Sequence, residues 1–179
     1  MLSGPSGVGK GTVLDQIRIR HPELWFSVSV PTRAPRPGEV AGEQYHFVEP
    51  TEFARMVEAG DFLEHAQYAG NRYGTPRAPV IARLDLGQPA LVEVELQGAR
   101  QIRRSMPDAF LIFLAPPSWD ELVRRLVGRG TEDDDAVARR LEIARRELQA
   151  EGEFDAVVVN DDVQAAADRV VTLSLNPPG

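Results

Sequence analysis

The feature that most constrains this chain is the segment GPSGVGK at residues 4–10, which follows a short apolar start and precedes a helical stretch. A strand, then G-x-x-x-x-G-K, then a helix is the arrangement in which backbone N–H groups surround a phosphate. Glycines let these groups turn inward without a clash from Cβ, and the helix N-terminus adds partial positive charge. Lys10 supplies a point charge for distal phosphates. The segment, called the phosphate loop below, therefore predicts a nucleotide site rather than a simple glycine-rich turn.

The residue after Lys10 departs from the usual pattern. Gly11 stands where a Ser or Thr hydroxyl ordinarily binds Mg²⁺, and Thr12 comes one position late. Because Mg²⁺ keeps several waters and can be held largely by substrate phosphates, acidic residues elsewhere could hold those waters. Thr12, on the first helical turn, is either a phosphate or metal contact or a simple helix cap.

Size and composition fit one globular domain. The chain has 179 residues, of which 42% are hydrophobic and 26% charged, and a net charge of −7 argues against general nucleic-acid binding. The absence of cysteine excludes disulfides and thiolate zinc sites and suits a reducing cytoplasm. No apolar run approaches the roughly 20 residues of a membrane span. We therefore expect a cytoplasmic protein with neither membrane nor nucleic-acid partners.

Apolar strand-like runs alternate with helical stretches, as in an α/β sheet. We expect strands at 1–3, 25–29, 45–48, 62–68, 90–96, 109–114 and 157–160. We expect helices from the phosphate loop to about residue 20, at 51–60 and 78–86, from the capping box SWDE at 118–121, at 134–150 and before Pro177. The runs at 90–96 and 109–114 should be central strands, and the run at 157–160 another core strand.

A second anion site is predicted in the segment SVSVPTRAPRPGE. Arg33 and Arg36 lie three residues apart in a loop stiffened by prolines, and guanidinium forks grip phosphate oxygens in pairs. Tyr45 and Tyr73 follow, and phenolic hydroxyls donate well to phosphate. Taken singly, each tyrosine could equally be a packing residue.

These segments occur in an order and spacing that resemble the guanylate kinase family. The motifs that carry the resemblance, across nearly the whole chain, are GPSGVGKGT, SVSVPTRAPRPGE, FLEHAQYAGNRYGT, VEVELQGA, FLAPPS, RRLVGRGTE and VVVNDD. The resemblance implies an α/β P-loop nucleoside monophosphate kinase with a parallel sheet. Its core would comprise residues 1–30, 78–125 and 142–179, with a GMP-binding insert at 31–77 and a lid at 126–141.

The resemblance also implies roles for individual residues. The ATP side would use Gly4, Ser6, Gly7, Val8, Gly9, Lys10, Gly11, Thr12 and the adenine-side Asn160. The GMP side would use Arg33, Arg36, Tyr45 and Tyr73 for phosphate, and Ser29, Glu39, Glu64, Thr75 and Glu95 around guanine. The chemistry agrees, because a carboxylate such as Glu64 accepts from both the ring N–H and the amino group of guanine, whereas adenine offers a lone pair there.

Two acidic residues in VEVEL complete the expected site. Glu93 and Glu95 are two residues apart and so share one face of an extended segment. The family commonly has Asp at both positions, the first near a metal-bound water and the second near guanine. Glu93 is therefore the expected Mg²⁺ contact, through water, with Thr12 as a second candidate. A solvated strand face is the alternative.

The implied reaction is transfer of the γ-phosphoryl group of ATP to GMP or dGMP with Mg²⁺. The expected catalytic residues are Lys10, Arg36 and the lid arginines Arg125, Arg129 and Arg140. A catalytically inactive guanylate-kinase-like interaction module is the alternative, although such modules usually lack an intact phosphate loop. A kinase for another acceptor is a further alternative, which Ser29, Glu64 and Thr75 argue against.

Overall fold

The computed structural model describes residues 1–43, 45–68, 70–127 and 134–178. Its described residues divide into two units. The first comprises Met1–Leu24, Glu93–Leu96 and Phe110–Gly179, and the second comprises Trp25–Val92 and Gln97–Ala109. The three-part division expected from the sequence is finer than this and stays a prediction.

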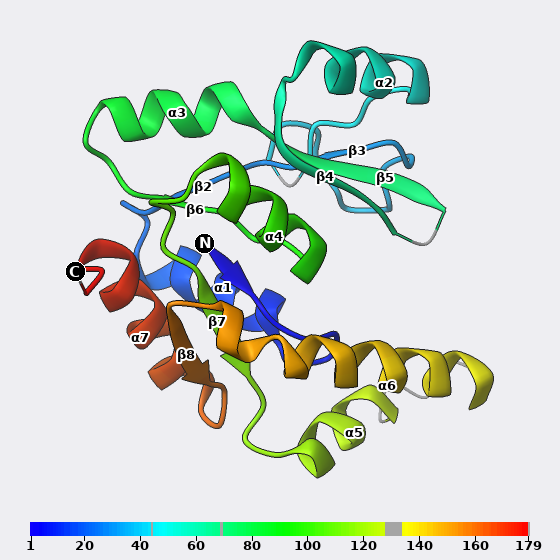
Figure 1. Cartoon of the computed structure of the whole chain (residues 1–179), viewed down its shortest axis with the longest axis vertical. Coiled ribbons are helices and arrows are strands. Elements are labelled where there is room, and N and C mark those ends of the chain that lie inside the picture. The colour runs from blue at the N-terminus through cyan, green and yellow to red at the C-terminus, as the bar shows by residue number, and fades with distance from the viewer. Residues whose placement is uncertain (44, 69, 128–133, 179) are drawn as a thin grey trace. The chain divides into compact units, whose positions relative to one another are not determined.

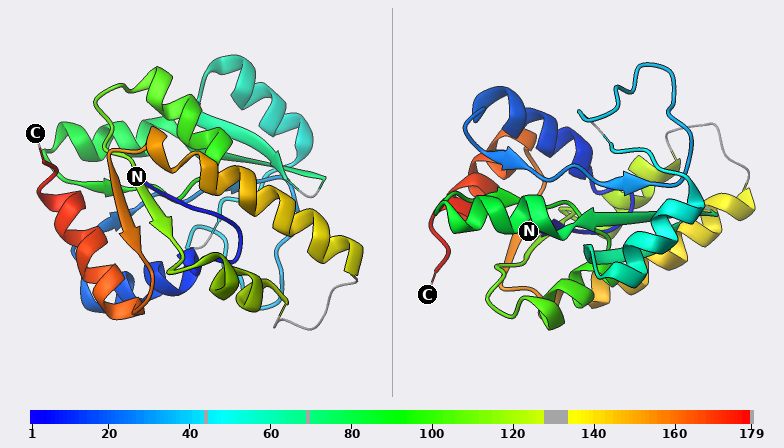
Figure 2. Two further views of the ribbon diagram at one scale, coloured as in Figure 1. Left: turned by 60° about the horizontal axis from the view of Figure 1, so that its bottom comes forward. Right: turned by 90° about the horizontal axis from the view of Figure 1, so that it is seen from above.

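The first unit is built on a parallel sheet in the order β1-β7-β8 (Figure 1). Its elements are β1 (Leu2–Ser3), α1 (Lys10–Arg20), β7 (Ile112–Ala115), α5 (Trp119–Val127), α6 (Asp134–Gln149), the 3₁₀ turn η1 (Glu151–Glu153), β8 (Ala156–Val159) and α7 (Val163–Leu175). All four residues of β7 are buried, as expected for a strand paired on both sides. Helices α1 and α7 pack together, as both views of Figure 2 show.

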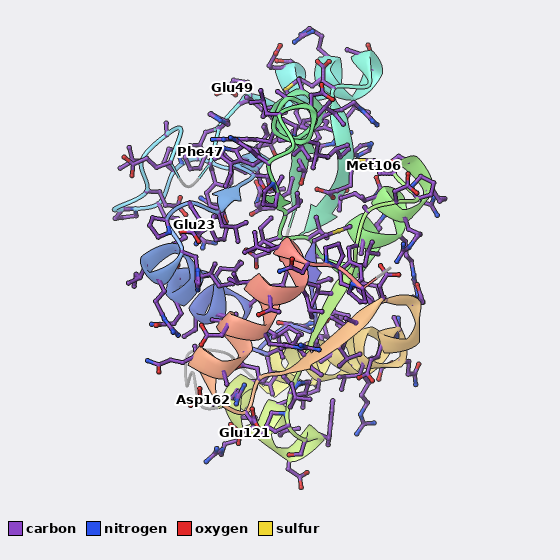
Figure 3. The ribbon with its side chains drawn as sticks, turned by 90° about the vertical axis from the view of Figure 1, so that its left-hand side faces the viewer. Glu23, Phe47, Glu49, Met106, Glu121 and Asp162 are labelled. Atoms are coloured by element: carbon purple, nitrogen blue, oxygen red, sulfur yellow. The ribbon has the colours of Figure 1, made fainter. Side chains whose placement is uncertain are left out.

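Two of these helices are capped at their N-termini by side chains. The Oγ of Ser118 accepts the N–H of Glu121 at 3.2 Å before α5, and the Oδ1 of Asp162 accepts the N–H of Ala165 at 2.8 Å at the start of α7 (Figure 3). Each bond satisfies an N–H group that has no partner inside its helix. The expected helix start at 118–121 is therefore confirmed, as is a last helix that ends before Pro177.

The second unit holds two smaller sheets. One pairs β2 (Trp25–Phe26) with β6 (Ala90–Leu91) in parallel, and the other has the antiparallel order β3-β5-β4. The remaining elements are β3 (Val30–Pro31), α2 (Pro50–Ala59), β4 (Phe62–Tyr68), β5 (Asn71–Pro76), α3 (Arg77–Asp85) and α4 (Leu96–Ser105), the last of which begins in the first unit.

Helix α2 covers one end of the antiparallel sheet. Its Phe53 is fully buried and stacks on Phe62 of β4, with ring centroids 4.6 Å apart, beside Val30 of β3. The helix has proline at its first position and ends at Gly60, whose φ of 71° places it in the left-handed region where glycine is favoured. Packing of this kind fixes the strands that carry the predicted guanine-reading residues.

Four strand predictions are wrong in extent, among them the run at 109–114, where the strand is Ile112–Ala115. The segment 90–96 forms a strand only at β6, because Glu93 makes a single bridge to Leu2 and α4 begins at Leu96. Tyr45–Val48 is not a strand, although Tyr45 bridges Ser29. The segment 25–29 is a strand over Trp25–Phe26 only. In the described residues, β2 and β6 pair over two residues each, whereas Tyr45 and Glu93 make isolated bridges only.

The strand β8 is also less enclosed than predicted. It lies at the edge of the three described strands, and Val157 and Val159 are 42% and 47% exposed, while Val158 is buried. A run of consecutive valines does not distinguish a strand covered on both faces from an edge strand with one open face. Among the described residues, no helix combines the length and apolar character needed to cross a bilayer.

Candidate functional site

The phosphate loop joins β1 to α1 in the first unit. Gly7 and Gly9 have φ values of 84° and 97°, and a β-carbon on Gly7 would lie 2.6 Å from Cδ2 of Leu126. Gly9 is the N-cap of α1, and within the fully described residues 1–43 no side chain caps this helix end. The first-turn N–H groups of α1, which have no acceptor inside the helix, are therefore suited to an anion.

Lys10 is held inside the loop. The residue is 8% exposed, and its Nζ donates to the carbonyl oxygen of Gly4 at 2.5 Å. The Oε2 of Glu95 lies 3.8 Å from the same ammonium group. The positive charge expected from the motif thus lies at the loop and is only partly balanced, by a carboxylate that is half-exposed.

Ser6 receives two contacts from α6. Arg140 donates from Nη2 to Ser6 Oγ at 3.4 Å, and the backbone N–H of Ser6 donates to Oε2 of Glu147 at 3.0 Å. Burial raises the pKa of the Glu147 carboxyl, and the Ser6 N–H opposes this shift. Glu147 is not among the residues predicted from the sequence. The available signal was its spacing of seven residues from Arg140, which puts both on one helix face.

The carbonyl oxygen of Val8 accepts two side-chain donors. Asn160 donates from Nδ2 at 2.8 Å and Arg125 from Nη1 at 3.1 Å. Arg125 also donates to the carbonyl of Asn160 at 3.1 Å and to Glu121 at 2.7 Å. The predicted adenine-side residue Asn160 and the predicted lid arginine Arg125 therefore both support the backbone of the phosphate loop. The buried Oδ1 of Asn160 accepts no hydrogen bond from any described residue.

Glu93 and Glu95 point to the same side, as predicted. Val92 and Val94 are buried, whereas both glutamates are exposed, and the N–H of Val94 donates to the carbonyl of Leu2 at 3.1 Å. Neighbouring protein atoms remove part of the hydration of the Glu93 carboxyl and so raise its pKa, although the residue is exposed. The nearby positive charge of Lys10 opposes this shift. The prediction that Glu93 and Glu95 share one face is confirmed. The reason is a short segment that runs beside β1, and not the seven-residue strand that was expected.

The residues that could approach Mg²⁺ carry the ligand type that this ion prefers. Glu93 offers carboxylate oxygens and Thr12, exposed on the first turn of α1, offers a hydroxyl. Gly11 supplies no ligand, and a β-carbon built on it would meet nothing within 4 Å. Among the described residues, no three His, Asp or Glu side chains group closely enough to hold a metal by themselves.

In the second unit, Arg33 is fixed by Glu39. Its Nη1 and Nη2 donate to the two carboxylate oxygens at 2.6 and 2.7 Å, and the backbone N–H of Arg36 donates to the same carboxylate at 2.7 Å. The Arg33 guanidinium also lies 4.9 Å from the ring centroid of Tyr45. These contacts, led by the Arg33 hydrogen bonds, lower the pKa of Glu39 to about 2. Arg36 itself is exposed.

The antiparallel sheet brings Tyr73 to this loop. Pro31 of β3 pairs with Tyr73 of β5, and the hydroxyl of Tyr73 contributes, after Glu39, to the raised pKa of Arg33. Ser29 is half-buried, and its carbonyl accepts the N–H of His46 at 2.9 Å. Four of the predicted GMP-side residues, Ser29, Arg33, Tyr45 and Tyr73, are therefore connected within one unit.

Glu64 and Thr75 form a buried pair across β4 and β5. The two residues are directly opposite in the register, and the Oγ1 of Thr75 donates to Oε1 of Glu64 at 2.6 Å. Glu64 is 7% exposed and Thr75 is fully buried. A β-carbon on Gly98 of α4 would lie 2.6 Å from Oε2 of Glu64. Gly98, which was not predicted as a site residue, thus gives the carboxylate its space.

The guanylate kinase family model matches residues 1–174 of this chain. The chain belongs to the guanylate kinase family. It is 62% identical to a guanylate kinase of Frankia casuarinae, over 98% of this chain and 95% of that protein. It is 59% identical to one of Thermobifida fusca, over 99% of this chain and 90% of that protein.

A solved structure agrees with this membership. The crystal structure of guanylate kinase from Anaplasma phagocytophilum matches with a TM-score of 0.75 and 34% identity, over 98% of this chain and 85% of that one. The resemblance read from the motifs is therefore confirmed, as is the α/β P-loop nucleoside monophosphate kinase fold. As a member of the guanylate kinase family, the chain is a nucleotide-binding transferase.

The predicted site residues of this guanylate kinase family member remain predictions in their individual roles. Arg129, with the rest of residues 128–133 of the predicted lid, lies outside the described residues. Arg125 and Arg140 contact the phosphate loop, and Glu95 lies beside Lys10. The predicted GMP-side residues, apart from Glu95, all lie in the second unit, and the predicted ATP-side residues all lie in the first.

Proposed function

We propose that the chain transfers the γ-phosphoryl group of ATP to GMP or dGMP, giving ADP and the corresponding diphosphate, with the residues assigned below. The observation that carries this proposal is the 54–62% identity to curated guanylate kinases over nearly the whole chain. Fold alone would not suffice, because a P-loop core serves many substrates. The residues of each unit supply the further arguments.

On the ATP side, the phosphate loop binds the phosphates through backbone N–H groups. The loop residues proposed for this role are Gly4, Ser6, Gly7, Val8, Gly9, Lys10, Gly11 and Thr12. When ATP binds, the Lys10 ammonium either leaves the Gly4 carbonyl or keeps that hydrogen bond while it also contacts the phosphates. In both cases it neutralises charge on the transferred group. Asn160 supports the loop through Val8, and its buried Oδ1 is available to a donor such as the amino group of adenine.

On the GMP side, Arg33, Arg36, Tyr45 and Tyr73 bind the phosphate. The Arg33 fork, held in place by Glu39, needs little ordering when a phosphate arrives. Glu64 reads the guanine base, because a buried carboxylate fixed by Thr75 accepts from the ring N–H and the amino group. Ser29, Glu39 and Glu95 complete the proposed contacts to the base.

The chemistry needs no general base. The second pKa of a phosphate monoester is about 6, so GMP is largely a dianion near neutral pH and is already a nucleophile. The protein must align two anions and neutralise their charge, which falls to Lys10, Arg36, Arg125, Arg129 and Arg140. Mg²⁺, when bound, neutralises phosphate oxygens, and Glu93 would hold one of its waters with Thr12 nearby.

A coupled assay with purified protein, ATP and Mg²⁺ tests the proposal. GMP and dGMP should be phosphorylated, whereas AMP, CMP and UMP should give rates at least about a hundredfold lower. Adenine and cytosine present a ring lone pair to the Glu64 carboxylate, and uracil presents carbonyl oxygens where guanine has its amino group. Equal rates with all five, or no turnover with GMP, would refute it. The second outcome is what an inactive interaction module predicts, and nothing in the described residues favours that alternative.

We also place the protein in the cytoplasm, working on small anionic substrates. Its net charge of −7 disfavours nucleic acid, and its lack of cysteine suits a reducing compartment. Imaging of a fluorescent fusion in the source cell, together with a gel-shift experiment using duplex DNA, would test both statements.

A further inference from the structure

Helix α6 contacts the phosphate loop twice at a single residue. Arg140 donates to Ser6 Oγ at 3.4 Å, and Glu147 accepts the Ser6 backbone N–H at 3.0 Å. The two side chains are seven residues apart, which is two helical turns, so they lie on one face of α6. One face of the helix is therefore connected to both the side chain and the main chain of Ser6.

The environment of Glu147 is unlike that of Glu142, the other glutamate of α6. Glu147 is 8% exposed, and buried carboxylates are retained only with hydrogen-bond partners. Glu142, one and a half turns earlier, is exposed and pairs with Arg146 on the helix surface at 3.0 Å. The burial of Glu147 thus accompanies its contact with the loop.

A carboxylate at this place cannot serve the phosphates directly. It is an acceptor only, as are phosphate oxygens, and two like charges repel each other. Any benefit to nucleotide binding must therefore come through the groups that Glu147 holds. The groups concerned are the Ser6 N–H, the nearby Glu95 carboxyl and Lys10 ammonium, and, through the helix, the guanidinium of Arg140. Of these, only the Ser6 N–H belongs to the loop backbone that Glu147 holds directly.

We propose that Glu147 is a positioning residue, which holds α6 against the phosphate loop and thereby sets where Arg140 lies relative to the phosphates of ATP. This inference rests on the proposed function, since it assigns Arg140 to those phosphates. The essential contact is one accepted hydrogen bond from a backbone N–H, a group that no substitution other than proline removes. A side chain that keeps an acceptor at the same length should keep the role.

The experiment compares Glu147→Ala, Glu147→Gln and Glu147→Asp with the control Glu142→Ala. Steady-state kinetics would give kcat and the KM values for ATP and GMP, and calorimetry would give the affinity for ADP without Mg²⁺. Glu147→Ala should weaken ADP binding and raise the KM for ATP by about tenfold, because a hydrogen bond to a charged group is lost. The KM for GMP should change less than about twofold.

The conservative variants distinguish positioning from simple packing. Glu147→Gln should recover ADP affinity to within about threefold, since its amide oxygen accepts the same N–H, and the shorter Glu147→Asp should fall between Gln and Ala. The control should match the wild type. If Glu147→Ala does not fold, the Gln and Asp variants still test the order of affinities.

The outcomes separate two failures. Glu147→Ala matching Glu142→Ala, or Glu147→Gln losing as much ADP affinity as Glu147→Ala, would overturn the positioning role. So would an equal rise in the KM values for ATP and GMP, which indicates general disruption. If instead the wild-type protein binds ADP but does not phosphorylate GMP, the proposed function fails, and the ADP affinities still decide the role of Glu147.

Discussion

The hydroxyl of Thr75 donates to the Glu64 carboxylate at 2.6 Å, across directly opposed positions of β5 and β4. Neither side chain is accessible enough to exchange this partner for bulk water. The carboxylate is thus oriented before any ligand arrives, which lowers the ordering cost of binding. Three of the predictions below concern groups that are fixed in this way.

Glu64→Gln should damage the use of GMP and leave ATP binding nearly unchanged. The amide keeps the size of the side chain, but it presents N–H donors where guanine also presents donors. We expect kcat/KM for GMP to fall by about a hundredfold or more, with the KM for ATP within about twofold. Steady-state kinetics measure both. Glu58→Gln, on the exposed surface of α2, is the matched control, and unchanged GMP kinetics would contradict the base-reading role.

Gly98→Ala should act on the same carboxylate from the other side. The added methyl would lie 2.6 Å from Oε2 and 3.2 Å from Cγ of Glu64, so the side chain must shift. We expect the KM for GMP to rise by about tenfold, with a loss of about 1–2 kcal/mol in unfolding free energy. Kinetics and urea unfolding measure these. Gly152→Ala, whose methyl meets nothing within 4 Å, should change neither quantity.

Gly11→Ser should be tolerated and should restore the usual hydroxyl after the loop lysine. Space is open around Gly11, and its φ lies outside the left-handed region. Replacing a helical glycine should stabilise the fold by about 0.5 kcal/mol. If the position faces the metal, half-maximal activity should need less Mg²⁺. Thermal unfolding and a Mg²⁺ titration test this, and an unaltered Mg²⁺ requirement would mean that Glu93 and the phosphates suffice.

The ion pair between Arg33 and Glu39 should survive to unusually low pH. Arg33, followed by the Arg36 N–H, lowers the pKa of Glu39 to about 2 from an ordinary value of 4.5. Because the folded-state pKa is depressed, the stabilisation is complete above about pH 4.5 and is lost as the pH falls through about 2. A carboxyl NMR titration should show this midpoint. A midpoint near 4.5, as an exposed glutamate gives, would mean that the pair is broken in solution.

Local signals predicted much of the fold. The helix expected at 134–150 is found at Asp134–Gln149, and the strand expected at 62–68 is found at Phe62–Tyr68. Caps, turn glycines and periodicity are properties of neighbouring residues, so one sequence contains them. The run at 90–96 was misread because its alternation matches a long strand, whereas the available pairing partners limit the ladder to Ala90–Leu91.

The site was less completely predictable, because some of its contacts join segments that are far apart in the chain. The motifs indicated Lys10, Arg33 and Glu64, whose residue types are matched to anions and guanine. Gly98 gave no such signal, and Glu147 gave only its spacing of seven residues from Arg140. Each matters because of a group more than thirty residues away in the chain, the Ser6 N–H for one and the Glu64 carboxylate for the other. Contacts between distant segments follow from the packed fold, and no short pattern contains them.

The bond between the Lys10 ammonium and the Gly4 carbonyl has one more consequence. It links the two ends of the loop, residues 4 and 10, and so restricts the conformation of the loop before a nucleotide binds. Little of the free energy of nucleotide association is then spent on arranging main-chain donors. Arrival of a nucleotide should accordingly resemble docking into a rigid receptor, with an on-rate governed by diffusion and charge rather than by refolding of residues 4–10.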